Sequence, residues 1–369
     1  MACEPNWRNS VSNTWMASPE QAGGWAGRRV ARLGASLLLL TLWTPVVLSA
    51  HHSGSEYDRT TVEIEGTLVE LVWQNPHVHF GVRATKDGKP VVWDIEANSL
   101  SILRRTDANP DNLKLGDRIK VAGAPSRQTP NKMWASNILP ANGREVVLGP
   151  GIPPRWKTTA DGQKTTWTEG GTDGDKAAGL FRVWSTKFGE PGGVWWRRDY
   201  PLTDAAKKKR AAFNPLTDTV APGCRPKGMP TIMEQPYPLE FLKKGDTILL
   251  RLEEYDTVRT IDMKGTPSRQ GPKTLLGTSQ GKWEGDTLVV TTTGISWTYF
   301  DPSGVPLGPS ASIVERFTPS PDGTRLALKM TVTDPDTFTQ PIDMQRTWVW
   351  RKGETVKPYN CVERKVAAR

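Results

Sequence analysis

Residues 62–72 read VEIEGTLVELV, and apolar and polar side chains alternate along most of this stretch. Such alternation places one set of side chains on each face of an extended chain, which is typical of a half-buried β-strand. Residues 78–82 (VHFGV) and 91–95 (VVWDI) predict two further strands. Between them, Lys86-Asp87-Gly88-Lys89 predicts a tight turn and therefore a hairpin.

A short helix and two more strands complete this first domain. Residues 99–105 predict the helix, with Asn98 as its N-cap. Residues 115–123 predict a turn followed by a strand, and residues 133–139 predict the last strand. A helix between the third and fourth of five strands is the order of an OB-type barrel. We therefore predict a mainly β protein with an OB-like five-stranded barrel over residues 51–148.

The last part of the chain, residues 223–369, predicts a second β domain. Its turn signals include Glu284-Gly285-Asp286 and Pro321-Asp322-Gly323. This spacing predicts an antiparallel meander that closes into a barrel or forms a sandwich. The apolar, alternating runs span residues 247–252, 258–263, 287–293, 313–317, 326–332 and 347–350. The triplet Gly281-Lys282-Trp283 is similar to the GxW of lipocalins, but its position in mid-domain does not support that kinship.

Composition limits the class of protein. Gly and Pro number 34 and 30, which indicates many turns and excludes a coiled coil or a multi-pass membrane protein, and the 16 Trp argue against wholesale disorder. Residues 149–222 predict an irregular connector that lies across one or both domains, because it is rich in Pro and Gly yet contains five Trp. Within it, residues 203–213 predict a helix whose basic run, Lys207 to Arg210, is interpreted as a solvated face.

The beginning of the chain predicts export. Arg28, Arg29 and Arg32 precede an uncharged stretch, residues 33–50, that ends in small residues. This is the pattern of a signal peptide, over residues 1–50, and cleavage is favoured over retention as a membrane anchor. Both Sec and twin-arginine export remain open. We expect a periplasmic or secreted protein without a membrane span after cleavage, for which nucleic acid is not an expected partner.

Two cysteines, Cys224 and Cys361, remain after cleavage. An even number in an oxidising compartment predicts a disulfide. Two free thiols or a metal pair are the alternative.

A set of short motifs carries a resemblance to a known family. They are Ala50-His51-His52-Ser53, Glu56-Tyr57-Asp58, Gly66-Thr67-Leu68-Val69, Trp73-Gln74-Asn75-Pro76-His77, Leu103-Arg104-Arg105 and Leu115-Gly116-Asp117. Over roughly residues 50–148, the chain resembles the exported bacterial domain of unknown function 6152. The resemblance implies export and a small β domain, and no activity. The C-terminal half is similar, through residues 281–290, to an uncharacterised region often joined to that domain. His79 is not part of the family pattern.

All four histidines of the chain lie close together in sequence, at His51, His52, His77 and His79. Cleavage after Ala50 would let the amine and imidazole of His51 chelate a metal, and cleavage one residue earlier would place His52 third, where Cu(II) can be enclosed. His77 and His79 share a face if the chain is extended. Nitrogen-rich ligand sets favour copper or nickel, and zinc by the same ligands stays open although no Cys-based zinc spacing exists. Glu56 or Asp58 could add an oxygen. The alternative is structural: His77 closes a turn, His79 lies on the barrel face and His51-His52 form an exposed tip.

Beyond the histidines the sequence carries few catalytic signals, and a pair of carboxylates stays open. It contains no nucleophile elbow, zinc-protease motif or phosphate loop. The carboxylates Glu240, Glu253, Glu254, Asp256 and Glu315 are each predicted to be solvated strand residues, and Trp297, Tyr299 and Phe300 to fill a core or cover a barrel mouth.

Three functions follow from these observations. We favour a non-enzymatic envelope binding protein with a copper site at its mature N-terminus and a small ligand or an envelope protein as partner. A copper oxidoreductase with an N-terminal histidine brace and a purely structural or interaction module are the alternatives.

Overall fold

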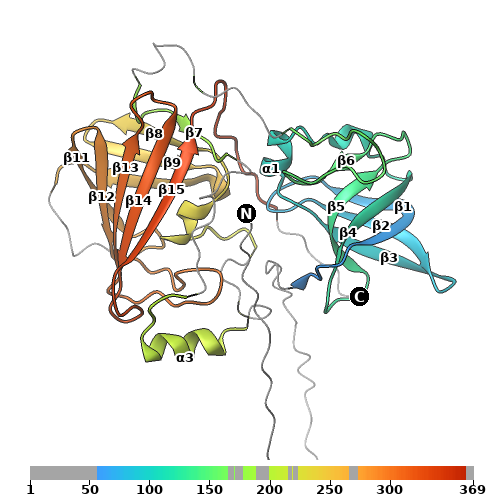
Figure 1. Cartoon of the computed structure of the whole chain (residues 1–369), viewed down its shortest axis with the longest axis horizontal. Coiled ribbons are helices and arrows are strands. Elements are labelled where there is room, and N and C mark those ends of the chain that lie inside the picture. Colours follow the sequence, from blue (N-terminus) through green and yellow to red (C-terminus); the bar gives the residue numbers. More distant parts are fainter. Residues whose placement is uncertain are drawn as a thin grey trace, which may run out of the picture. The chain divides into compact units, whose positions relative to one another are not determined.

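The computed structural model describes residues 56–164, 170, 178–187, 199–214, 218, 223–265 and 273–362. Two β-barrels account for most of them (Figure 1). The predicted signal peptide, together with His51 and His52, lies outside the described residues. None of the described helices combines the length and the apolar character that crossing a bilayer requires.

The first barrel is closed, as the OB-like pattern predicts. Its sheet has the order β3-β2-β1-β4-β5-β6, and a parallel pairing between β3 and β5 closes the five longer strands into a barrel, with β6 paired to β5. Closure removes free sheet edges, which otherwise invite pairing with other chains. The strands are β1 (Val62–Val72), β2 (His79–Lys86), β3 (Lys89–Glu96), β4 (Arg118–Pro125), β5 (Lys132–Leu139) and the short β6 (Val146–Val147).

Helix α1 (Leu100–Arg105) lies between β3 and β4 and is followed by the 3-10 helix η2 (Pro110–Asn112). The hydroxyl of Ser99 accepts the Ile102 backbone N–H, so the N-cap is Ser99 and the prediction of Asn98 was wrong. Asn98 instead donates its side-chain amide to the Leu148 carbonyl. Ser99 is the N-cap because its hydroxyl lies one residue nearer the first turn, where the unpaired N–H groups of a helix begin.

The second barrel is a nearly closed sheet of nine strands with the order β15-β14-β13-β12-β11-β10-β9-β8-β7. All neighbouring pairs are antiparallel except β10 and β11, which run parallel. Two hydrogen bonds between Ser185 and Val349 bring the two ends of the sheet together. The strands are β7 (Val183–Trp184), β8 (Leu239–Lys244), β9 (Thr247–Leu252), β10 (Thr257–Asp262), β11 (Thr278–Glu284), β12 (Thr287–Thr293), β13 (Ser312–Pro319), β14 (Arg325–Thr333) and β15 (Ile342–Val349).

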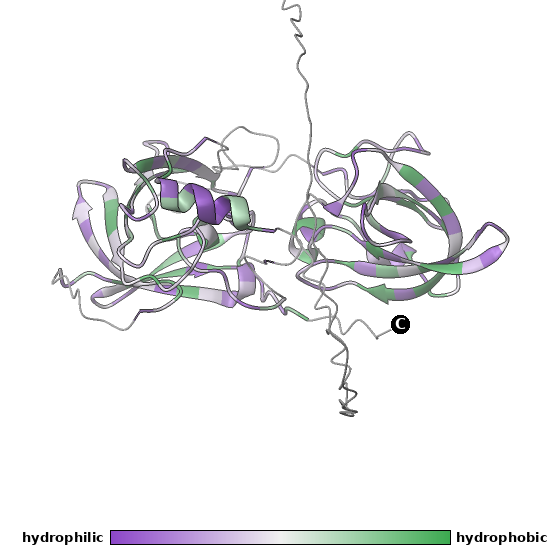
Figure 2. Ribbon diagram, turned by 90° about the horizontal axis from the view of Figure 1, so that it is seen from below, coloured by the Kyte–Doolittle hydropathy of each residue, from purple (hydrophilic) through white to green (hydrophobic). Residues whose placement is uncertain are grey.

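Hydrophobic and hydrophilic positions alternate along the strands of both barrels, while helix α3 (Asp204–Ala212) is largely hydrophilic (Figure 2). The interior of the second barrel is an exception to the usual apolar filling. Arg259 and Glu315 are almost completely buried there and form a two-pronged ion pair, with Nη2 to Oε2 at 2.6 Å and Nη1 to Oε1 at 3.0 Å. Ser279 and Thr292 add hydroxyl partners to the guanidinium. These hydrogen bonds to the two terminal nitrogens of the guanidinium offset much of the cost of burying the charge pair.

The 3-10 helix η3 (Thr231–Glu234) contacts the barrel residues at one end of this interior. Arg346 donates to the Met233 carbonyl, and the Trp297 indole donates to the Thr231 hydroxyl. Trp297 and Phe300 are buried, which confirms their expected role as core residues. Another 3-10 helix, η4 (Glu254–Asp256), connects β9 to β10.

The segments that connect the barrels attach to each of them. Trp156 donates its indole N–H to Glu63 on β1, whereas Trp184 is fully buried in β7. The predicted disulfide between Cys224 and Cys361 is present, and its two cysteines are separated by 137 positions in the sequence.

Candidate functional site

His77 lies in the loop between β1 and β2, and buried hydrogen bonds fix this loop. The amide of Asn75 donates to the Ser101 hydroxyl at 3.1 Å and to the Tyr359 carbonyl at 2.7 Å. The side-chain oxygen of Asn75, Oδ1, accepts the Ser101 backbone N–H. The loop is therefore held both by helix α1 and by a segment almost 300 residues later in the sequence.

The imidazole of His77 has a defined orientation. Its Nδ1 lies 3.0 Å from the Ala97 carbonyl oxygen, and its ring meets the Trp134 ring edge to face at 5.2 Å. A carbonyl can only accept, so Nδ1 carries the proton and the lone pair is on Nε2. Burial lowers the pKa of His77 to about 4, and the neutral ring is the form that binds metals.

Glu96 is the buried carboxylate next to His77. One oxygen lies 3.9 Å from His77 Nδ1, and the other accepts the Tyr57 hydroxyl at 3.1 Å. In the strand ladders, Glu96 lies opposite His79 on β2 and opposite Trp134 on β5. Directly opposite residues share a face of a sheet, so the outer face of the barrel brings together His79, Glu96 and Trp134.

The chain segment that precedes β1 is anchored on this same face. The carboxylate of Glu56 binds the buried Lys132 ammonium at 2.8 Å and accepts the Ser126 hydroxyl. Tyr57 contacts Trp134 edge to face, and burial followed by the charge of Glu96 raises the pKa of its hydroxyl. We call residues 51–57 the N-terminal arm, and Glu56 and Tyr57 form its base. This base is thus fixed within contact of Glu96.

The structure describes two of the four histidines, His77 and His79. His77 and His79 are both partly exposed, while Val78 between them is fully buried, as an extended chain requires. Within the described residues, no three His, Cys, Asp or Glu side chains are grouped so that they could hold a metal. Glu56 is committed to Lys132 and Ser126, and Asp58 accepts the backbone N–H of Arg59. Glu96, which the sequence did not suggest, places a carboxylate oxygen 3.9 Å from His77 Nδ1.

Three carboxylates predicted to be solvated are buried instead: Glu253, Glu254 and Glu315. Glu240 is only partly exposed and Asp256 is exposed. Each buried carboxylate has a partner that offsets its desolvation. Glu253 accepts the Lys357 backbone N–H, Glu254 binds Lys227, and Glu315 binds Arg259. The partners of Glu253 and Glu315 lie more than 50 residues away, so local patterning could not reveal them.

Glu254 belongs to a polar cluster that the sequence analysis missed. One carboxylate oxygen binds the Lys227 ammonium at 2.8 Å, and the other receives no hydrogen bond from any described residue. Burial opposes the charge of Lys227, but the attraction of Glu254 outweighs it and raises the pKa of the ammonium. Tyr255 and Asp256 both have positive φ, at 55° and 51°, a conformation that side chains rarely adopt. The charge of Lys227 lowers the pKa of His77 and the charge of Glu254 raises it, so this cluster is electrostatically coupled to His77.

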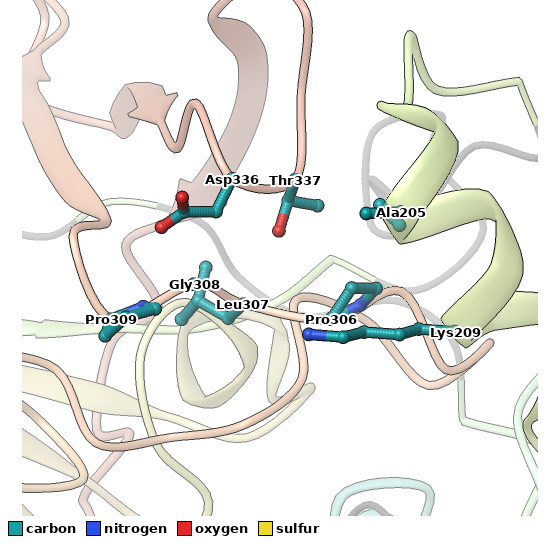
Figure 3. A pocket seen from close by; sticks show the side chains of 9 residues that line it. Ala205, Lys209, Pro306, Leu307, Gly308, Pro309, Asp336 and Thr337 are labelled. Atoms are coloured by element: carbon teal, nitrogen blue, oxygen red, sulfur yellow. The ribbon is translucent and has the colours of Figure 1, made fainter.

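A surface pocket of about 380 Å³ lies between helix α3 and the loop before β13. Figure 3 shows Lys209 on one side and Asp336 and Thr337 on the other, with Pro306 to Pro309 forming the wall. Asp336 already accepts the Ser310 hydroxyl. None of the predicted site residues lines this pocket.

The fold and this face define a two-barrel β protein with a histidine-bearing outer face on its first barrel. Residues 41–133 match the model of a family of unknown function (DUF6152). This match confirms the resemblance inferred from the sequence, over the segment that leads into the first barrel and most of its strands. A comparison with curated proteins finds no match.

Proposed function

We propose that this protein is an exported, non-enzymatic binding protein that holds Cu(II) through His51, His52, His77 and His79. The observation that carries the proposal is the hydrogen bond from the Tyr57 hydroxyl to Glu96, because it fixes the base of the N-terminal arm beside His77. His52 precedes Tyr57 by five residues, and five residues of extended chain reach at most about 18 Å. The arm is therefore long enough to return to the His77 face.

The chemistry of the face supports a nitrogen-rich copper site. The Nδ1–H bond of His77 to a backbone carbonyl is the arrangement that commonly orients a metal-binding histidine through Nε2. Glu96 lies where it could accept a hydrogen bond from a ligand or supply an oxygen. Imidazole and amine nitrogens together favour Cu(II) over most other divalent ions.

The disulfide between Cys224 and Cys361 supports the exported location. Disulfides persist in oxidising compartments and are rare in the cytosol. The basic and apolar leader of residues 28–50 supports the same proposal.

Copper titration of protein processed by its own leader tests the proposal. We expect one Cu(II) per chain, with at least three nitrogen ligands in its EPR spectrum. The His77→Ala/His79→Ala variant should lose affinity by about 100-fold, since two of four ligands are removed. Tyr57→Phe keeps the ring but releases the arm, so its affinity should fall less, and its spectrum should keep the same ligands.

Two outcomes would change the assignment. Unchanged affinity in the double variant would confine copper to the arm and refute the two-part site. Mass spectrometry of the mature N-terminus tests the alternative of a histidine brace. A terminal His51 together with oxygen reactivity would indicate the copper oxidoreductase. A terminal Ala50 would exclude a brace.

A further inference from the structure

One end of the second barrel opens into a pocket of about 500 Å³ that none of the preceding roles uses. Residues of the β8–β9 turn, the end of β10 and strand β11 line it. Its volume lies within the range of about 300–1,000 Å³ that is usual for small-molecule sites. It contains the Gly281-Lys282-Trp283 triplet, which the sequence singled out without giving it a role.

The walls of the pocket are apolar and partly aromatic. Trp283 is 44% exposed, which is unusual for the largest apolar side chain, and its ring meets the Phe181 ring edge to face at 6.1 Å. Ile248 and Met263 supply further apolar lining. A Cβ at residue 281 would collide with the Met263 sulfur, so glycine there lets Met263 lie flat against β11.

The rim of the pocket is positively charged. Lys243 and Lys282 both line it, as does Asp246. Asp246 is paired with Lys264 at 3.3 Å, and Lys282 is paired with Glu284 at 2.6 Å. Lys243 forms no ion pair with any described residue, so one ammonium remains for a ligand beside the aromatic wall.

We propose that this pocket binds an amphiphilic carboxylate, with its alkyl chain or ring packed against the wall formed by Trp283 and Phe181 and its carboxylate at Lys243. Apolar surface buried against the aromatic wall supplies affinity, and the ammonium selects anions over neutral analogues. The site lies in the second barrel, so it stands independently of the copper proposal.

Calorimetric titration of the full mature protein with decanoate, and with decanol as the neutral analogue, tests the assignment. Decanoate should bind one per chain, and decanol should bind about tenfold more weakly. Trp283→Ala should weaken both ligands by about tenfold, because it removes the larger part of the wall. Lys243→Ala should weaken decanoate alone, by about fivefold.

Matched controls lie outside the pocket. Val258→Ala removes another exposed apolar side chain, and Lys208→Ala removes another exposed ammonium, on helix α3. Both should bind decanoate as the parent protein does, and all four variants should keep its unfolding midpoint because the altered side chains are exposed. Equal binding of decanoate and decanol would refute the charge selection, and undiminished binding by Trp283→Ala would refute the pocket itself.

Discussion

At the scale of single residues, Glu234 at the end of η3 makes the stability of the protein depend on pH. Burial raises the pKa of this carboxyl to about 8, from an ordinary value of 4.5. Between these values the folded state holds a proton that the unfolded state has released. The free energy of unfolding should therefore fall as the pH rises from about 5 to 8, by at most about 1.4 kcal/mol per pH unit from this group.

Glu234→Gln should flatten this slope, because the amide does not titrate. Urea unfolding at several pH values measures it. Glu284→Gln is the matched control, since its two cationic neighbours, Lys282 and Arg316, lower the pKa of Glu284 to about 2 and its titration is complete above pH 5. An identical slope in the parent protein and in Glu234→Gln would show that Glu234 does not retain its proton.

Residues whose role depends on a distant partner could not be assigned from the sequence. Val258 and Arg259 are neighbours on β10, and apolar patterning would place the valine inside. The structure exposes Val258 and buries Arg259, because Glu315 on β13 binds the guanidinium within the barrel. The pairing of the two cysteines was predictable because the export pattern left only one pair.

At the scale of single elements, helix α1 depends on its cap. Ser99→Ala should lower the free energy of unfolding by about 1 kcal/mol, since the Ile102 N–H loses its side-chain acceptor and keeps only the Ser99 carbonyl. Hydrogen exchange at Ile102 reports this directly and should accelerate. Asn98→Ala removes the bond to Leu148 instead, so it should leave exchange at Ile102 unchanged. Faster exchange in Asn98→Ala alone would restore Asn98 as the cap.

Strands were predictable where their inward residues are apolar. β1, β9 and β12 show this alternation and agree with the predicted ranges to the residue. β11 was missed because its inward positions include Ser279 and Gly281 in place of large apolar side chains. Ser279 serves the Arg259–Glu315 pair and Gly281 makes room for Met263, so tertiary contacts decide both identities.

At the scale of the whole molecule, the disulfide should contribute strongly to stability. Cross-linking residues 137 positions apart restricts the unfolded chain, and the entropy model gives up to about 5 kcal/mol. Cys224→Ser/Cys361→Ser should therefore unfold at a clearly lower urea concentration, with a loss of about 2–5 kcal/mol. The reduced parent protein should unfold at the same concentration as the double variant. An unchanged midpoint in both would show that the ends of the loop are already held by other contacts.

The two-barrel architecture was predictable in outline, but whether the second domain forms a barrel or a sandwich was not. The order of strands and helix indicated the first barrel, because alternation and turns are local properties. The second barrel recruits β7 from the connector, where two residues, Val183 and Trp184, pair with β8. A two-residue strand carries no periodic signal, so no sequence pattern could place it.

The contact between Asn75 and the segment around Cys361 constrains the order in which the protein can mature. The side-chain amide of Asn75 donates to the Tyr359 carbonyl, and the backbone carbonyl of Asn75 accepts the Val362 N–H. The loop that positions His77 is therefore completed by residues made nearly 290 positions later. A ribosome or translocation channel delivers the first barrel long before those residues emerge. The loop that positions His77 therefore cannot form its full set of hydrogen bonds until residues 359–362 have been synthesised.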